Sequence, residues 1–171
     1  MVLIGAGYTL TQKLVEVAIE AYFDAAQQEL LLQADPANID NSRVFRRVHE
    51  GTDGNDSTEG GSGQDRISLG DGDDTLAGLS GEDLLQGGRG KDQLFGGADS
   101  DEFYFTASRN SRDVVKDFEL GLDRLVFQGL SLSDLSVATA GGGTVISWSG
   151  GSVRLNGIAT SSIDAASFDF V

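Results

Sequence analysis

The chain has 171 residues, 39% of them hydrophobic, which is enough for one or two small domains with an apolar core. Its 27 acidic residues outnumber 12 basic ones, and the net charge of −15 argues against nucleic acid and anionic membrane surfaces as partners and favours cations. Because cysteine is absent and no apolar stretch is long enough to span a bilayer, we expect no disulfide, no thiolate metal site and no transmembrane segment.

Residues 1–50 predict an N-terminal helical cap. The segment Thr9-Leu10-Thr11-Gln12 is typical of a capping box, and apolar residues at helical spacing follow it, so we expect a helix over residues 10–34 that ends before Pro36. An apolar stripe of this kind most often packs on a core, here as a lid over the first coil of the region that follows. A helix that binds a partner protein is the alternative. Residues 2–7 are too short and lack the positive flank of a secretory signal.

Residues 43–49 contain three arginines and the only histidine of the chain. Such a basic cluster fits an anionic ligand, a phosphate or a polysaccharide. Intramolecular salt bridges with the acidic region that follows are the commoner use of arginines in this position.

A nonapeptide repeats six times without insertion over residues 51–104. The copies are GTDGNDSTE, GGSGQDRIS, LGDGDDTLA, GLSGEDLLQ, GGRGKDQLF and GGADSDEFY. Glycines at the first, second and fourth positions indicate a backbone that bends sharply and exposes its carbonyl groups, and about three residues per copy remain for a strand. The sixth position holds Asp56, Asp65, Asp74, Asp83, Asp92 and Asp101; the fourth holds Gly54, Gly63, Gly72, Gly81 and Gly90, with Asp99 in the last copy; the eighth holds Thr58, Ile67, Leu76, Leu85, Leu94 and Phe103, which we expect to point inward.

Charge is concentrated in the repeats, where residues 51–104 carry 13 acidic and 3 basic side chains, an excess of ten negative charges. Stacked copies would place carboxylates about 5 Å apart, and each such pair repels by roughly 3 kcal/mol at an effective dielectric constant near 20. Divalent cations remove this repulsion, and hard oxygen ligands favour Ca²⁺ over transition metals. A flexible acidic linker is the alternative for such a composition, but the strict period argues against it.

The nonapeptide resembles the GGxGxDxUx motif of RTX (repeats-in-toxin, hemolysin-type) proteins. The resemblance implies a mainly β fold, a right-handed parallel β-roll whose successive copies form opposite sides, with Ca²⁺ held between turns two copies apart. It implies about four Ca²⁺ sites, formed by the pairs Asp56 with Asp74, Asp65 with Asp83, Asp74 with Asp92, and Asp83 with Asp101. The predicted metal-binding residues are these six aspartates, the five fourth-position glycines, and Asp53, Asp71 and Asp99. Because Thr58 is a poor core residue, we expect the first site to be looser than the others.

Residues 105–171 predict a β-rich C-terminal cap of the kind that follows the repeats in many RTX proteins and covers the edge of the last coil. Residues 113–118 and 123–127 alternate like strands around a turn at Gly121, and a hairpin is expected from Thr144 to Ile158 with a turn at Ser149-Gly150-Gly151. Residues 164–171 resemble the uncleaved C-terminal signal of the type I secretion route. A last strand within the cap is the other interpretation of this segment.

With one histidine, no cysteine and no HExxH motif, the sequence gives no sign of a catalytic centre. We expect a secreted protein of a Gram-negative bacterium that uses type I secretion machinery, folds on binding extracellular Ca²⁺ and has a structural, matrix or adhesive role. An extracellular polysaccharide or surface partner is left open. The alternative is a C-terminal folding and secretion module of a larger secreted protease, lipase or polysaccharide-modifying enzyme.

Overall fold

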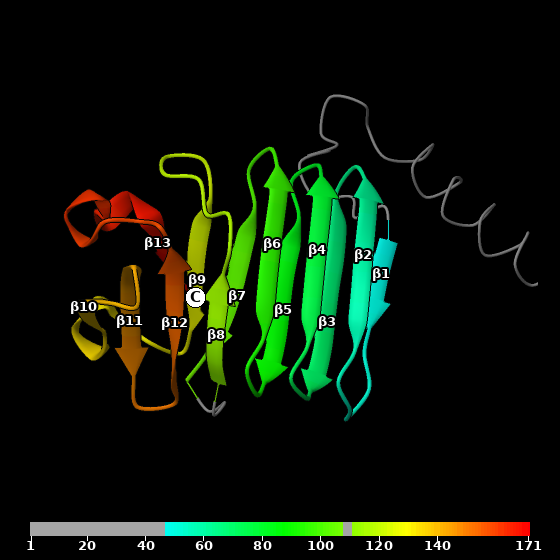
Figure 1. Cartoon of the computed structure of the whole chain (residues 1–171), viewed down its shortest axis with the longest axis horizontal. Helices are drawn as coiled ribbons and strands as arrows, with labels where there is room; N and C mark the ends of the chain where they lie inside the picture. Colours follow the sequence, from blue (N-terminus) through cyan, green and yellow to red (C-terminus); the bar gives the residue numbers. More distant parts are fainter. Residues whose placement is uncertain (1–46, 108–110) are drawn as a thin grey trace, which may run out of the picture. The chain divides into compact units, whose positions relative to one another are not determined.

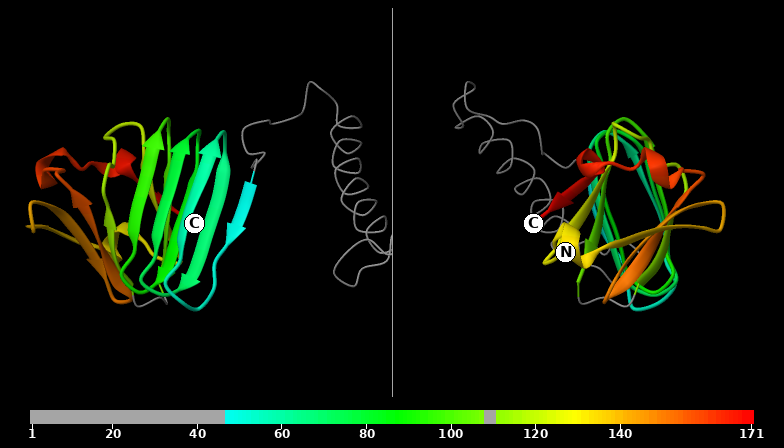
Figure 2. Two further views of the ribbon diagram at one scale, coloured as in Figure 1. Left: turned by 45° about the vertical axis from the view of Figure 1, so that its right-hand side comes forward. Right: turned by 90° about the vertical axis from the view of Figure 1, so that its left-hand side faces the viewer.

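The computed structural model describes residues 47–107 and 111–171, so the predicted helix over residues 10–34 lies outside the described residues. The chain alternates between two facing β-sheets and forms a parallel β-roll, as predicted (Figures 1 and 2). The six-stranded sheet has the order β1 (Arg47–Glu50), β3 (Asp65–Asp71), β5 (Leu84–Arg89), β7 (Glu102–Thr106), β9 (Arg124–Gln128) and β13 (Phe168–Phe170). The seven-stranded sheet has the order β10 (Ser136–Ala140), β11 (Gly143–Trp148), β12 (Gly151–Asn156), β8 (Ser111–Val115), β6 (Gln93–Ala98), β4 (Thr75–Ser80) and β2 (Ser57–Ser62).

Each copy of the nonapeptide pairs in parallel with the copy two further along the chain. Ile67 lies opposite Leu85 in one sheet, and Leu76 lies opposite Leu94 in the other. The predicted strand length of three residues is wrong, because β3 has seven residues and β4 has six. The two residues that open the next copy continue the ladder, as Gly70 does opposite Gly88, although both of these glycines have positive φ angles.

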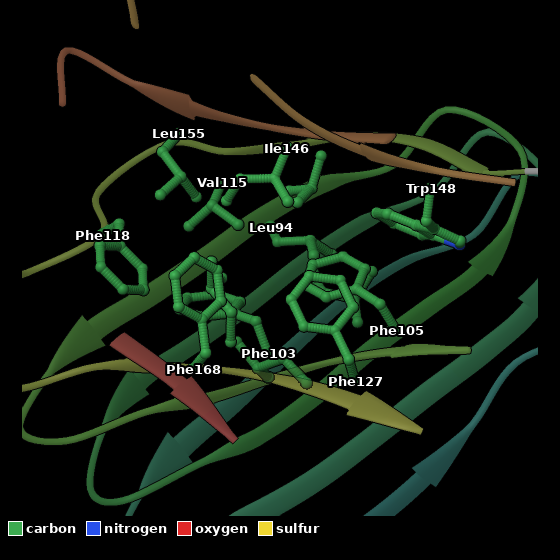
Figure 3. Close-up of a cluster of buried hydrophobic side chains, with 14 of the residues drawn as sticks. Leu94, Phe103, Phe105, Val115, Phe118, Phe127, Ile146, Trp148, Leu155 and Phe168 are labelled. Atoms are coloured by element: carbon green, nitrogen blue, oxygen red, sulfur yellow. The ribbon is translucent and has the colours of Figure 1, made fainter. Parts of the chain in front are cut away.

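The eighth position of the repeat supplies the core, as predicted. Five of its six side chains are fully buried, whereas Thr58 in the first copy is only half-buried. Val115 in β8 and Leu125 in β9 extend the buried rows beyond the repeats. The core ends in an aromatic cluster, in which the ring centroid of Phe127 lies 5.3 Å from that of Trp148 and 5.5 Å from that of Phe105 (Figure 3). The fully buried eighth-position residues are Ile67, Leu76, Leu85, Leu94 and Phe103.

Parallel stacking continues past residue 104, because β8 pairs with β6 and β9 pairs with β7. The strands predicted on either side of Gly121 therefore exist, but they lie in opposite sheets. The predicted hairpin is confirmed by β11 and β12, in which Trp148 lies opposite Gly151. The last strand, β13, pairs in parallel with β9. Three short 3-10 helices complete the C-terminal part: η2 (Leu132–Asp134), η3 (Thr160–Ser162) and η4 (Ala165–Ser167).

No helix within the described residues has the length and the apolarity that crossing a membrane requires.

Leu79 occupies the second position of its copy, where glycine stands in most others. Its φ angle is +84°, in the left-handed region, and its side chain is 45% exposed. A side chain with a Cβ costs about 1–2 kcal/mol in this conformation, and little burial offsets that cost here.

Replacing Leu79 by glycine should therefore stabilise the folded roll by roughly 0.5–1 kcal/mol, since relief of the strain exceeds the entropy that glycine adds to the unfolded chain. Chemical denaturation at a fixed, saturating Ca²⁺ concentration measures the difference. Leu120→Gly is the matched control, because Leu120 is 44% exposed and has no positive φ. An equal effect of both substitutions would contradict the strain at Leu79.

Candidate metal centre

The sixth-position aspartates form two ladders, one on each side of the roll. Each backbone N–H donates to Oδ1 of the aspartate two copies later, from Asp56 to Asp74 at 2.8 Å and from Asp74 to Asp92 at 3.0 Å. On the other side the same bond joins Asp65 to Asp83 at 2.7 Å and Asp83 to Asp101 at 2.9 Å. These are the four predicted pairs, and the structure brings each of them together.

Each aspartate is one rung of its ladder. In five of the rungs the second carboxylate oxygen, Oδ2, is buried and accepts no hydrogen bond. These aspartates are at most 2% exposed, and Oδ2 of each lacks a partner among the described residues. Burying an ionised carboxylate without compensation costs several kcal/mol. A row of such oxygens is stable only if protons or cations neutralise it. The five aspartates are Asp65, Asp74, Asp83, Asp92 and Asp101.

The first-position glycines leave the space that these oxygens face. A Cβ on Gly60 would lie 2.6 Å from Oδ2 of Asp65 and 2.7 Å from the carbonyl oxygen of Gly78, one coil further on. Gly78 repeats the arrangement: its Cβ would overlap Oδ2 of Asp83 and lie 2.7 Å from the carbonyl oxygen of Gly96. A carboxylate oxygen and a carbonyl oxygen thus converge on one point without a donor between them. This donor set fits a hard cation such as Ca²⁺.

No three carboxylate or imidazole side chains converge as a metal cluster anywhere in residues 47–107 and 111–171. A cation between two rungs therefore takes at most two carboxylates and needs backbone carbonyls for its remaining ligands. The glycine-rich turns expose such carbonyls, and large, flexible oxygen coordination of this kind is typical of Ca²⁺.

Burial raises the pKa of the inner ladder carboxyls. Together with a smaller effect of neighbouring carboxylates, it raises the pKa of Asp83 to about 6 and that of Asp101 to about 8. The pKa values of Asp74 and Asp92 are raised for the same reasons. The site therefore prefers neutral carboxyls when no cation is bound.

The other predicted metal-binding residues fall into two groups. Four of the five fourth-position glycines adopt positive φ, and Asp99, which takes this position in the sixth copy, does so at +79°, as its tolerance of this region predicts. Asp53 is exposed, and Asp71 forms a surface ion pair with Arg89 at 3.3 Å, so neither side chain lies in a ladder. The four glycines with positive φ are Gly63, Gly72, Gly81 and Gly90; the φ angle of Gly54 is not positive.

Two ladder residues were missed by the sequence reasoning. The N–H of Asp92 donates to Oδ1 of Asp113 at 3.2 Å, 21 residues later, and the N–H of Asp101 donates to Oδ1 of Asp123 at 3.0 Å, 22 residues later. Insertions of three and four residues hide them from a search with an 18-residue period. What still marks them in the sequence is the end of the motif, D-x-U, in which U is a large apolar residue. It occurs as Asp113-Val114-Val115 and Asp123-Arg124-Leu125.

Three of the four outer rungs, Asp56, Asp113 and Asp123, are satisfied by the protein itself, whereas neither carboxylate oxygen of Asp65 has a partner among the described residues. Oδ2 of Asp56 accepts from the backbone N–H of Thr52 at 2.7 Å, and Oδ2 of Asp123 accepts from that of Glu119 at 2.8 Å. The carboxyl of Asp113 is hydrogen-bonded by Ser111. The demand for a cation is therefore concentrated at Asp74 and Asp92 in one ladder and from Asp65 to Asp101 in the other.

Arg47 stands at the head of the second ladder, opposite Asp65 in the parallel pairing of β1 with β3. Its Nη1 donates to the carbonyl oxygen of Gly60 at 2.8 Å. No ion pair joins Arg47 to a carboxylate of the described residues, and its guanidinium contacts β2 at Gly60 instead. The other two arginines of the basic segment, Arg43 and Arg46, lie outside the described residues.

The pKa shifts predict how the cation-free roll responds to pH. The folded-state pKa values of Asp83 and Asp101 lie above the ordinary value of about 3.9, so the folded state binds more protons than the unfolded state between about pH 4 and pH 8. Without Ca²⁺ the stabilisation from these two carboxyls should be complete below about pH 4 and should be lost as the pH rises from about 4 to about 8. Thermal unfolding followed by circular dichroism in Ca²⁺-depleted buffers tests this. Constant stability over that range would contradict it.

Comparisons with known proteins bear on this site. The family model of the RTX calcium-binding nonapeptide repeat matches residues 50–85 and 77–107. Among solved structures, the AlgE6R3 subunit of the Azotobacter vinelandii mannuronan C5-epimerase is 30% identical, with a TM-score of 0.55, and the match covers 69% of this chain and 79% of that one. The AlgE6R2 subunit of the same enzyme is 28% identical, with a TM-score of 0.52 over 77% of this chain and 96% of that one.

The extracellular lipase LipA from Serratia marcescens has the same fold, with a TM-score of 0.59, 24% identity and 72% of this chain covered. This chain spans only about a fifth of the lipase, 21% of its length. No curated protein matches the sequence.

Proposed function

Because this chain belongs to the family of RTX calcium-binding nonapeptide repeat proteins, we propose that Ca²⁺ occupies its two aspartate ladders and that binding completes the fold outside the cell. The observation that carries the proposal is the set of buried Oδ2 atoms without a donor, at Asp65, Asp74, Asp83, Asp92 and Asp101. A divalent cation supplies two positive charges where these oxygens converge with turn carbonyls.

The residues that would hold Ca²⁺ are the sixth-position aspartates together with carbonyl groups of the glycine-rich turns. Four sites are proposed, one between each pair of neighbouring rungs from Asp56 to Asp92 and from Asp65 to Asp101. The half-buried Asp56, whose Oδ2 is already bound by Thr52, supports the expectation that the first site is the weakest. Asp113 and Asp123 close the two ladders at the other end.

The proposed role of Ca²⁺ is that of a folding switch. Extracellular modules typically bind Ca²⁺ with dissociation constants of about 10⁻⁴ to 10⁻³ M, far above the free concentration in a cytoplasm. The carboxylates therefore repel one another inside the cell and keep the repeats unfolded. Outside, binding energy becomes folding energy. This fits export through type I secretion machinery from a Gram-negative bacterium, for which residues 164–171 are the proposed signal.

Far-ultraviolet circular dichroism at neutral pH, with a chelator and with millimolar Ca²⁺, tests the switch. The β-sheet signal should appear with Ca²⁺, and Mg²⁺ at the same concentration should not replace it, because Mg²⁺ demands tighter octahedral geometry. A chelated protein that keeps its full β-sheet signal would show that the roll does not need the cation.

Substitutions within the ladders give a sharper test. Asp83→Asn keeps an Oδ1 acceptor for the N–H of Asp65 but removes a charge that two proposed sites share. The Ca²⁺ concentration at the folding midpoint should rise by roughly tenfold, the equivalent of about 1.4 kcal/mol. Asp56→Asn is the matched control, since Asp56 belongs to one proposed site, and its midpoint should shift by less than half as much on a logarithmic scale. Equal shifts would contradict the arrangement of sites.

The proposed role outside the cell is structural or adhesive and does not include catalysis. The second candidate is a C-terminal module of a larger secreted enzyme. It is favoured by the structural similarity of this chain to part of a lipase and to subunits of an epimerase. The intact mass of the native secreted product separates the two: a mass near 17.9 kDa supports the first candidate, and a much larger one supports the second.

A further inference from the structure

The two outer faces of the roll carry different charges. Side chains alternate along a strand, so the residues between the buried ones face outward. On the seven-stranded sheet the charged residues of this outer face are Arg112, Lys116, Arg154 and Glu59. The face therefore has an excess of positive charge, although the chain as a whole has a net charge of −15. On the six-stranded sheet the charged outward residues are Glu50, Arg66, Glu102, Arg124 and Asp169, an excess of negative charge.

Two of the three cationic side chains lie on neighbouring strands, Arg112 on β8 and Arg154 on β12, and Lys116 directly follows β8. Arg154 of β12 lies opposite Val114 of β8, so Arg112 and Lys116, two residues to either side of Val114, are its diagonal neighbours (Figure 1). Their Cα atoms are about 8 Å apart, because neighbouring strands lie about 4.8 Å apart and two residues rise about 6.6 Å. Arg112 and Lys116, four residues apart along one strand, span about 13 Å. Glu59 lies on β2, three strands away from β8.

These cations have no acidic partner in the part of the chain that the structure describes. Ion pairs there join Arg89 to Asp71 at 3.3 Å and Arg124 to Asp169 at 3.4 Å, both away from this face. Nε of Arg154 is buried and has no hydrogen-bond partner among the described residues. The guanidinium of Arg154 also packs against Gly141, where a Cβ would lie 2.8 Å from Nη1. An arginine held in place beside two other unpaired cations is suited to an anionic ligand.

The remaining outward residues around the cations suit a sugar. Gln93 of β6 lies opposite Val114, and Ser152 of β12 lies opposite Arg112, so amide and hydroxyl groups alternate with the cations. The N–H of Lys116 donates to the carbonyl oxygen of Leu94, which places the half-buried ring of Phe95 beside Lys116. An aromatic ring beside polar groups is a platform for the apolar face of a pyranose.

We propose that this face, the cationic face of Arg112, Lys116, Arg154, Gln93, Phe95 and Ser152, binds a linear acidic polysaccharide that carries carboxylates. Cations spread over about 13 Å are too far apart for one small carboxylate and match several carboxylates along a chain. A cavity of about 530 Å³ is lined by residues of β1 and β3 such as His49 and Ser68, in the other sheet, and so does not belong to this face. Nucleic acid fits less well, because the overall charge opposes a dense polyphosphate.

The inference rests on the proposed function in one respect: the face exists only while the roll is folded. The experiment is isothermal titration calorimetry of the Ca²⁺-saturated full chain with oligouronates about eight sugars long, which are short enough not to gel with Ca²⁺. A neutral oligosaccharide of the same length is the ligand control. We expect binding of the oligouronate that weakens as NaCl is added, and no binding of the neutral sugar.

The test variant is Arg112→Gln with Arg154→Gln, and its matched control is Arg66→Gln with Arg124→Gln on the opposite face. The test variant should lose about tenfold in affinity, and the control should change by less than twofold. Circular dichroism confirms first that each variant folds with Ca²⁺ as the wild type does. Equal losses in both variants, equal binding of the neutral sugar, or tighter binding of a DNA duplex or an acidic peptide than of the oligouronate would overturn the proposal.

The failure of this inference is distinguishable from that of the Ca²⁺ switch. A wild type that folds on adding Ca²⁺ but does not bind the oligouronate contradicts the cationic face alone. A wild type that binds the oligouronate and is fully folded with a chelator contradicts the switch and leaves the face intact.

Discussion

Repulsion between buried carboxylates one coil apart is the constraint on which this structure depends. Each inner rung places a carboxylate at strand spacing from the next and leaves one oxygen without a donor, as at Asp83 between Asp65 and Asp101. The pKa values of Asp83 and Asp101 are raised for the same reason, because burial and the neighbouring carboxylates favour the neutral carboxyl group. The roll tolerates these rows only if an external charge balances them, and a divalent cation does so at neutral pH.

Other features of the repeat follow from this constraint. Glycine holds the first position in every copy except the third, which has Leu69, and a Cβ on Gly78 would overlap Oδ2 of Asp83. The core contributes one large side chain per copy, so the apolar surface that can oppose the repulsion is limited. At three of the four ladder ends, Thr52, Ser111 and Glu119 provide donors to the last carboxylates, and these ends are closed by hydrogen bonds. The fourth end, Asp65, has no donor for either carboxylate oxygen among the described residues.

The sequence predicts the interior of the repeats well because their period is strict. A fixed phase of nine residues defines the two ladders from Asp56 to Asp101, the inward row from Ile67 to Phe103, and the left-handed conformation of Asp99. The hairpin of β11 and β12 was predictable from alternation and a glycine turn. Strand length was not predictable, because whether glycines continue a ladder depends on the coil that they pair with.

Features beyond the strict period were harder to predict. Asp113 and Asp123 join the ladders after insertions, and only their D-x-U tails mark them. The strands around Gly121 alternate as expected, but no local pattern shows that they lie in opposite sheets. The cationic face combines Arg112 of β8 with Arg154 of β12, which are 42 positions apart in the sequence. Only the order of the strands in the folded sheet brings them together.

Amide hydrogen exchange at the ladder residues is the most direct test of the central claim. The N–H groups of Asp65, Asp74 and Asp83 donate to the carboxylates of the next rung, so their protection reports whether the ladders are formed. At neutral pH the account predicts slow exchange of these amides with millimolar Ca²⁺ and exchange near the unfolded rate with a chelator. Equal protection under both conditions would show that the carboxylate rows can be buried without a cation, and would contradict the account.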